Sequence, residues 1–300
     1  MAYPTDSFTS TDLQYHIPAV WGERLNDFYK TKLVMADFFV NRSEELADGG
    51  NILYTPGLTE MSANSKSNAT AVTLNSPAES RVTLTVDQWY EVSFSIEDKE
   101  AAQVKKSYAI MEAYAKNAGY TIARKLETAI ATLFSGFSQT VGASTTNLAD
   151  SEIRAAIAYL ETANIDTSSE CAFFLSTNVF WKQVQNINKF SLAINSPVND
   201  PTAKRPAAYL YGIPVFVSNN IQYVSGTTGR YNALAHKDAI HWATSSLGTG
   251  GSKGAMVGKN GVRVQSNYIP EYLGTLTTAD ILYGVIENRD TSGVAIITAA

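Results

Sequence analysis

The residues of this chain best suited to chemistry are its three histidines, His16, His236 and His241. His236 stands two residues before Asp238, so a base and a carboxylate lie close together, as a hydrolytic triad requires. No Gly-x-Ser-x-Gly elbow accompanies them, and no HExxH spacing favours a metal. An ordinary strand-end histidine explains the pattern better. A soluble hydrolase using His236 and Asp238 stays open as the weaker alternative, and we expect no catalytic residue.

Two other features resemble sites at first sight. The glycine-rich stretch 247–261 invites a phosphate-cradle interpretation, but Gly258-Lys259 is followed by Asn260 rather than Ser or Thr. A mobile surface loop is therefore predicted there. The single cysteine, Cys171, excludes intrachain disulfides and any cysteine-based zinc site. We expect no cofactor and no metal.

Composition narrows the class of protein further. The 300 residues are 45% hydrophobic and 17% charged, with a net charge of −5, which is typical of a folded globular chain. The mildly acidic balance argues against a dedicated nucleic-acid binder. No apolar run approaches the ~18 residues that a membrane span needs.

The most informative segment is 81–96, where apolar and polar residues alternate over 16 positions. The alternation is broken only by Gln88 on the apolar side and Trp89 on the polar side. A shorter alternating piece, 70–75, precedes it across the turn-forming residues 76–80. Together they predict a long hairpin, and Trp89 on its polar face fits an interface or, equally well, an ordinary cross-strand contact.

A long helix is predicted directly after the hairpin, over 97–135. Apolar residues step by three or four from Val104 to Phe137, and no proline interrupts them. Ser95 and Asp98 have capping-box spacing, and the carboxylates of Glu97, Asp98 and Glu100 suit the N-terminal end of the helix dipole. Gly119 is a candidate bend.

These two lengths carry the main structural expectation. A helix over 97–135 would span about 58 Å, and a strand over 81–96 about 50 Å. A compact chain of this size has a radius of gyration near 19 Å, so its diameter is roughly 50 Å. Either one of the two elements is broken, or the molecule is extended and plate-like. In an extended molecule the protruding hairpin should pair with other subunits, because open strand edges otherwise invite aggregation.

The remaining pattern predicts an α+β domain. Helices are expected at 20–36, at 151–163 with Asp150 as N-cap, and at 177–187, and a small-residue linker at 138–147. Strands are expected at 171–175, 212–217, 231–235, 238–242, 280–286 and 294–297.

This order of parts resembles the major capsid protein of tailed bacteriophages, the Hong Kong 97 capsid fold. Trp89–Ile96 runs into Glu97–Phe137 as the E-loop hairpin runs into the spine helix in that family. The further matching stretches are Tyr211-Gly-Ile-Pro-Val-Phe, Leu234–Ile240, and Tyr283-Gly-Val with Arg289 and Val294-Ala-Ile. The resemblance covers essentially the whole chain.

The resemblance implies five parts: an N-terminal arm and short helix (1–50), the E-loop hairpin (51–96), the P-domain with its spine helix (97–145), the A-domain (146–275) and terminal strands returning to the P-domain (276–300). It also implies self-assembly through pentamers and hexamers into an icosahedral virion capsid around double-stranded DNA, built in the host cytoplasm. A separate scaffolding protein and a portal are implied partners. An encapsulin-like nanocompartment shell is the alternative within the same fold.

The resemblance also points to contact residues. Lys66, Trp89, Tyr90, Glu97 and Asp98 are the expected assembly contacts. Some members of the family cross-link Lys to Asn covalently, and Lys66 with Asn64 and Asn68 on the proposed hairpin matches that chemistry only weakly, because such residues abound in polar loops.

Overall fold

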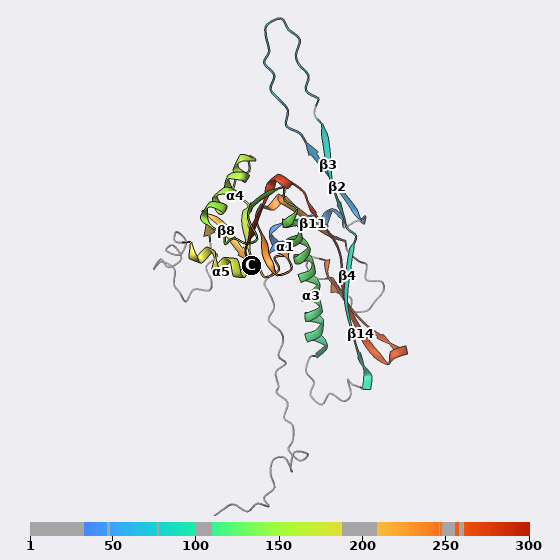
Figure 1. The fold of residues 1–300 in the computed structure, drawn as a ribbon. Helices are drawn as coiled ribbons and strands as arrows, with labels where there is room; N and C mark the ends of the chain where they lie inside the picture. Colours follow the sequence, from blue (N-terminus) through green and yellow to red (C-terminus); the bar gives the residue numbers. More distant parts are fainter. Residues whose placement is uncertain are drawn as a thin grey trace, which may run out of the picture.

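The computed structural model describes residues 33–46, 49–76, 78–99, 110–187, 209–245, 247, 256–257 and 261–300. They form two β-sheets that meet through a shared core, with helices against the sheets and a separate hairpin that projects from the body (Figure 1). The helices are α1 (Met35–Phe38), α3 (Ile110–Thr132), α4 (Asp150–Thr162) and α5 (Thr177–Lys182). None of the described helices is long and apolar enough to cross a membrane.

One sheet is the platform for the long helix α3. Its hydrogen-bonded order is β1-β11-β14-β13-β12. Strand β4 lies off this path and also pairs with β14. Helix α3 buries a stripe of Ala118, Ile122, Leu126 and Ile130, one residue per turn, against this sheet and the shared core. The strands are β1 (Val40–Asn41), β4 (Gln88–Glu97), β11 (Ile240–Ser245), β12 (Met256–Val257), β13 (Arg263–Ile269) and β14 (Gly274–Glu287). We call this unit the helix lobe.

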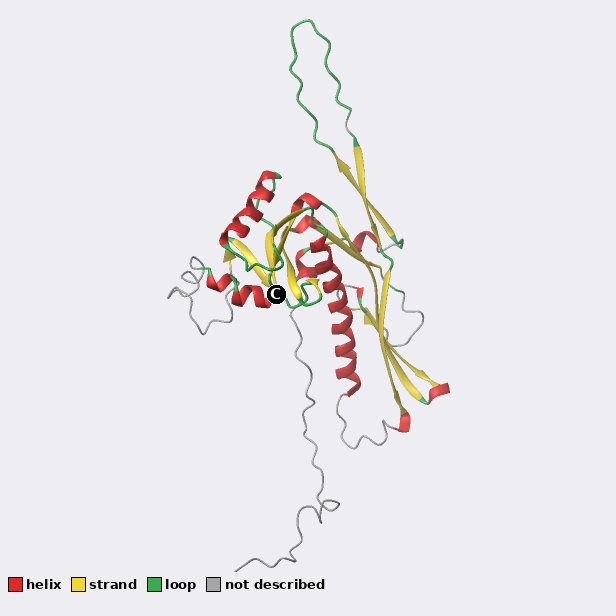
Figure 2. Cartoon of the chain, viewed as in Figure 1, coloured by secondary structure: helices red, strands yellow, loops and turns green. Residues whose placement is uncertain are grey.

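The second sheet has the order β5-β15-β10-β6-β8-β7, with β9 paired to the end of β10. Its strand β6 is buried at every position, and Ile153 and Leu160 of α4 pack in the same apolar cluster as Phe173 and Leu175 of β6. The strands are β5 (Gln139–Gly142), β6 (Cys171–Leu175), β7 (Tyr209–Leu210), β8 (Ile213–Val217), β9 (Tyr223–Ser225), β10 (Thr228–His236) and β15 (Gly293–Thr298). We call this unit the second lobe (Figure 2).

Two short crossovers join the lobes. The 3₁₀ turn Lys237–Ala239 connects β10 to β11, and the 3₁₀ turn Asp290–Ser292 connects β14 to β15. The amides of Asn288 and Arg289 both donate to the carbonyl of Ala239, at 2.8 and 3.3 Å, so the two crossovers are bonded to each other. The remaining 3₁₀ turns are Ser43–Leu46, Leu133–Ser135, Val184–Asn186 and Pro270–Tyr272.

The projecting hairpin consists of β2 (Ile52–Leu58) and β3 (Glu79–Thr85), paired with each other and with no third strand among the described residues. Its base is held by a small cluster in which Leu84 and Val86 pack with Leu46 and Ala243. The base crosses β14 at Gly284, where a Cβ would lie 2.1 Å from the carbonyl oxygen of Thr85. The glycine is therefore a condition for the crossing.

The prediction of one continuous strand over 81–96 is wrong, because this segment forms two strands. β3 ends at Thr85 and pairs with β2, whereas β4 begins at Gln88 and pairs with β14, so Val86 and Asp87 form a corner. The alternation itself holds on both sides, because Leu84, Val92 and Phe94 all face packed surfaces. Gln88 and Trp89, which break the alternation in the sequence, follow directly after the corner. Residues 70–75 form no strand, and the partner of β3 is 52–58 instead.

The helix predicted over 97–135 is also shorter where it is described. Ser95 lies in β4 opposite Leu276 and therefore caps no helix, whereas Glu97, the last residue of β4 and opposite Gly274, directly precedes the helical residues Asp98 and Lys99. Residues 100–109 lie outside the described residues, and α3 runs from Ile110 to Thr132, about 35 Å. It is continuous through Gly119.

Smaller corrections concern the second lobe. The linker predicted at 138–147 contains β5, which pairs in parallel with β15. Helix α4 begins one residue early, because the carboxylate of Glu152 accepts the amide of Ala149 at 3.0 Å and Asp150 is already helical. Helix α5 ends at Lys182 rather than 187. In 238–242 only the last three residues are strand. Most of 20–36 and of 247–261 lies outside the described residues.

A buried carboxylate fixes where the described chain enters the body. Glu127 of α3 is fully buried and accepts three backbone amides at the start of α1, from Val34 at 2.7 Å, Met35 at 2.9 Å and Ala36 at 3.1 Å. These are amides that a helix start leaves without internal partners. A single side chain therefore ties α1 to α3.

Glu127→Ala should lower the free energy of unfolding by roughly 2–5 kcal/mol, because three buried amides lose their acceptor. Glu127→Gln should fall between the two, since it keeps one carbonyl oxygen. Urea unfolding of the wild type and both variants measures this. Glu161→Gln, an exposed carboxylate on α4, is the control and should change stability by less than about 0.5 kcal/mol. Equal stability of Glu127→Ala and wild type would contradict the assignment.

Gly284→Ala should loosen the hairpin base, because the new methyl group meets backbone atoms of Thr85 that cannot move aside cheaply. Gly119→Ala is the matched control: its Cβ meets nothing within 4 Å, so it should stabilise α3 by roughly 0.5–1 kcal/mol. Thermal unfolding reports both signs. Limited proteolysis near 86–87 should accelerate only in Gly284→Ala, and unchanged cleavage there would refute the crossing constraint.

Candidate assembly surface

The hairpin exposes more unpartnered apolar surface than its own packing can explain. Side chains that are mostly exposed line it from base to tip. They are Ile52 (41% exposed), Tyr54 (51%), Leu58 (87%), Met61 (64%), Val72 (68%) and Leu74 (86%). A two-stranded hairpin is only marginally stable in water by itself. The projection therefore presents an exposed apolar surface on a marginally stable element.

The hairpin tip is held by side chains rather than by a strand ladder. Lys66 donates from Nζ to the carbonyl of Ser67 at 2.9 Å and to the carbonyl of Thr70. The amide groups of Asn64 and Asn75 bond across the loop at 3.1 Å. Lys66 is thus engaged within its own loop in the single chain, and a covalent link to Asn64 or Asn68 stays a prediction.

Trp89 and Tyr90 lie together in sequence but on opposite faces of β4. Trp89 is 65% exposed, and its indole donates to the carboxylate of Asp280 at 3.1 Å, which is also paired with Arg263 at 2.9 Å. Tyr90 stacks on Tyr283 with centroids 6.0 Å apart. The sheet and its ion pair therefore hold Trp89 in an exposed position.

Glu97 and Asp98 lie at the far end of β4. Asp98 accepts the hydroxyl of Tyr268 at 2.8 Å, and its amide donates to the carbonyl of Leu273 at 2.8 Å. Tyr272 and Leu273 are exposed at this same end, in the turn between β13 and β14. The five expected contact residues therefore occupy three separate places: the hairpin tip, the start of β4 and its far end.

Sequence reasoning missed the most exposed contacts, Leu58 and Leu74. Leu58 belongs to a strand whose pattern is interrupted by Pro56 and Gly57, which hide its alternation. Leu74 lies in the alternating stretch 70–75, whose apolar residues were expected to be strand and are instead unpaired. The alternation was present in the sequence, but within the described residues it pairs with no strand.

His236 does not belong to a hydrolytic arrangement. Its Nδ1 accepts the amide of Asp238 at 3.2 Å, and its Nε2 lies 3.6 Å from a carboxylate oxygen of Glu170. Within the described part of the chain, no serine hydroxyl is hydrogen-bonded to the ring. His241 is buried, and burial together with the neighbouring Arg42 lowers its pKa. The geometry gives the hydrolase alternative no nucleophile.

The lone cysteine is equally unsuited to chemistry. Burial, with Asp166 and Glu170 nearby, raises the pKa of the Cys171 thiol to about 11. A thiol of that kind is protonated at neutral pH and is a poor nucleophile.

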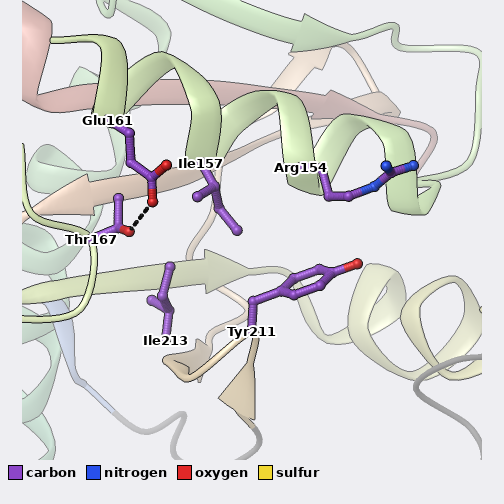
Figure 3. A pocket seen from close by; sticks show the side chains of 6 residues that line it. All are labelled: Arg154, Ile157, Glu161, Thr167, Tyr211 and Ile213. Carbon is purple, nitrogen blue, oxygen red and sulfur yellow. Dashed lines mark hydrogen bonds between the residues drawn. The ribbon is translucent and has the colours of Figure 1, made fainter.

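The second lobe carries an open cavity of about 340 Å³ between α4 and β8. Figure 3 shows Ile157 and Ile213 pointing into it, with Arg154 and Tyr211 at one end and the Glu161–Thr167 hydrogen bond at the other. Arg154 is paired with Asp150 at 3.1 Å. Among the residues that line the cavity, no nucleophile is paired with a general base, so we assign the cavity no reaction.

A pair of carboxyl groups lies where the lobes join. Burial and the adjacent Asp290 raise the pKa of Glu287 to about 7. Burial raises the pKa of Asp290, whereas hydrogen bonds from Ser138, whose amide donates at 2.6 Å, lower it. The net result is a lowered pKa for Asp290. Glu287 lies so close to Gly136 that a Cβ there would be 2.7 Å from Oε2. This crossover is therefore sensitive to proton binding.

Comparison with solved structures identifies the architecture. The chain matches the capsid structure of the cyanophage P-SCSP1u with a TM-score of 0.74 at 11% identity, over 99% of this chain and 97% of that one. It matches a structure from Mycobacterium phage Che8 with a TM-score of 0.71 at 18% identity, over 93% and 96%. The mature capsid of bacteriophage PhiM1 gives 0.72 at 12%, over 99% and 96%. No family model and no curated protein matches the sequence.

The chain thus has the Hong Kong 97-type capsid fold, as the order of its parts predicted. These likenesses extend over nearly the full length of both chains. The identities are low, so what the chains share is the fold.

Between pH 5 and pH 8 the wild type should lose stability that Glu287→Gln keeps. A folded pKa raised from 4.5 to about 7 gives stability that is full below about 4.5 and is lost as the pH rises through about 7. Gln cannot ionise, so the variant should unfold at a higher temperature than wild type at pH 8 and at a similar one at pH 5. Glu271→Gln, at an exposed position, is the control. Parallel pH profiles for wild type and Glu287→Gln would contradict this.

Proposed function

We propose that this chain is a structural capsid protein that assembles with copies of itself into a closed icosahedral shell. The observation that carries the proposal is the projecting hairpin on a capsid fold. It exposes six large apolar side chains and has no third strand in the described part of the chain.

Geometry favours rings over symmetric pairs. The hairpin extends away from the body, on the side opposite the far end of β4 (Figure 1). A contact between this projection and a different surface of the next copy is head-to-tail, and such contacts close into rings when the rotation permits. Pentamers and hexamers are the rings from which we propose the shell is built. Each subunit then contacts several neighbours, so individually weak contacts add through multivalency.

The remaining parts of the proposal follow from the fold likeness. The shell encloses double-stranded DNA held by proximity rather than by a dedicated site, consistent with a net charge of −5. A separate scaffolding protein and a portal act as partners during assembly in the host cytoplasm, and the mature location is the virion. The role is structural and non-enzymatic. The divisions at residues 50, 96, 145 and 275 are the proposed domain boundaries.

Electron microscopy and native mass measurement of the expressed chain test this proposal, with and without a scaffolding partner. We expect closed particles or pentamers and hexamers. Soluble monomers under both conditions would count against it. Particles that enclose protein cargo and no DNA would favour the nanocompartment alternative.

The double variant Leu58→Asp with Leu74→Asp should abolish or strongly reduce assembly, because charge replaces the apolar surface that neighbours cover. Both positions are more than four-fifths exposed in the single chain, so the melting temperature of the monomer should be nearly unchanged. Ser65→Asp, an exposed polar position on the same tip, adds charge without removing apolar surface and should still assemble. Normal assembly of the double variant would show that the hairpin is not the contact.

A further inference from the structure

We infer that the chain binds a small oxyanion, a phosphate or carboxylate group, where α3 meets the turn between β8 and β9. The donors are Arg124 of α3, Asn220 in that turn and Arg230 of β10. The inference goes beyond the proposed function and does not depend on it, because it concerns the folded single chain. It begins from buried donors that have no acceptor.

The side-chain amide of Asn220 has a donor without a partner. The residue is 6% exposed, and its Oδ1 accepts the Nε–H of Arg124 at 3.2 Å. That bond fixes the orientation of the amide, so the remaining polar atom, Nδ2, is a donor. Nδ2 is buried and has no acceptor within the described residues. Because buried donors are nearly always bonded, this atom indicates that an acceptor is missing.

Arg230 has an unused edge of the kind that binds carboxylates. Its Nη1 donates to the carbonyl of Ile221 at 2.5 Å, and its guanidinium lies 3.4 Å from the centre of the Tyr223 ring. Its Nε is buried and has no acceptor in the described part of the chain. Arg263 uses the corresponding atoms, Nε and Nη2, to bind the carboxylate of Asp280 at 2.9 and 2.6 Å. Arg230 is therefore held in place with its carboxylate-binding edge unpaired.

The two arginines also lack a negative charge. Arg42 and Arg263 each pair with a carboxylate, whereas Arg124 and Arg230 bond only to an amide oxygen and a main-chain carbonyl among the described residues. Glu127, one turn along α3 from Arg124, is occupied by three main-chain amides. A water molecule would satisfy the buried donors but leave the positive charge uncompensated. An oxyanion does both.

Burial of the donors limits the size of the ligand. Asn220 Nδ2 and Arg230 Nε are buried, whereas Arg124 is exposed. The phosphates of a nucleic-acid duplex lie along a wide, rigid rod, which cannot bring one of them to buried atoms. A single phosphate or carboxylate group can enter beside the exposed side chain of Arg124, whose Nη1 and Nη2 then donate as well. The ligand class is therefore a small oxyanion.

The site would connect the two lobes. Arg124 belongs to α3 of the helix lobe, whereas Asn220 and Arg230 belong to the second lobe. Between these two, Ile221 packs in the same apolar cluster as Ile122 of α3. A bound anion adds charge-assisted hydrogen bonds from both lobes at the edge of this apolar contact. Binding to the folded chain alone should therefore raise its stability.

Thermal unfolding of the full chain tests the site, in sodium phosphate, sodium acetate or sodium chloride at equal pH and ionic strength. Phosphate at about ten times its half-saturating concentration should raise the melting temperature of the wild type by about 2–4 °C relative to chloride. A similar shift in acetate would assign the site to oxyanions in general, and no shift in acetate would assign it to phosphate. Equal melting temperatures in phosphate and chloride would overturn the inference.

The variants separate binding from general effects, because phosphate also stabilises folded proteins by exclusion from their surface. Arg124→Gln and Asn220→Leu should each lose most of the phosphate shift. Arg124 is exposed, so its variant should fold even if Asn220→Leu does not. Arg154→Gln, at another exposed arginine, is the matched control and should keep the full shift.

A purely structural role for Arg124 predicts a different result. Arg124→Gln would then lower the melting temperature equally in phosphate and chloride and leave the shift between them unchanged, which would contradict the inference. Assembly is not part of the measurement. The oxyanion site and the shell proposal can therefore fail separately.

Discussion

The carboxylate of Glu127 holds together the part of the molecule on which the rest is built. It is an acidic side chain without solvent contact, stabilised by hydrogen bonds from three backbone amides at the start of α1. Because α1 is fixed to α3 in this way, Phe39 can pack on Phe134 and Phe174, and the indole of Trp242 can donate to the carbonyl of Ala36 at 3.1 Å. β1 then pairs with β11 in register. The junction of the lobes is thereby a packed core.

The projecting hairpin differs from this core in how far its large apolar side chains are buried. The core of the body buries large aromatic side chains almost completely, with Phe134, Phe173 and Trp242 at 1% exposure or less. The hairpin leaves leucines in water and relies on Leu84 and Val86 at its base. A rigid platform with a marginal extension is suited to a subunit whose neighbours are equivalent in sequence but not in position.

Much of the architecture could be predicted from the sequence, because local patterns decide it. The alternation before residue 97, the apolar stripe of α3 and the buried run Cys171–Leu175 each depend on neighbours a few residues apart. Boundaries failed where long-range contacts decide. The corner at Val86 exists because Gly284 lets the chain cross β14, and β5 forms because β15 lies beside it. Neither cause is visible in the local pattern.

The contact residues were harder to predict for the same reason. Trp89 was singled out because it violates the alternation, and Lys66 because of the family resemblance, and their role as contacts stays a prediction. Leu58 follows a proline and a glycine, so nothing in its neighbourhood marks it as strand. In the carboxyl pair of Glu287 and Asp290, it is Asp290 that accepts the amide of Ser138, which lies 152 positions away in the sequence. Only the folded chain brings such groups together.

One topological detail bears on how the protein is made. β15 lies in the interior of its sheet, between β5 and β10, although it comprises residues 293–298. A nascent or truncated polypeptide that stops before this point lacks the strand that joins two halves of the second lobe. A copy without residues 293–298 should therefore fail to complete the second lobe.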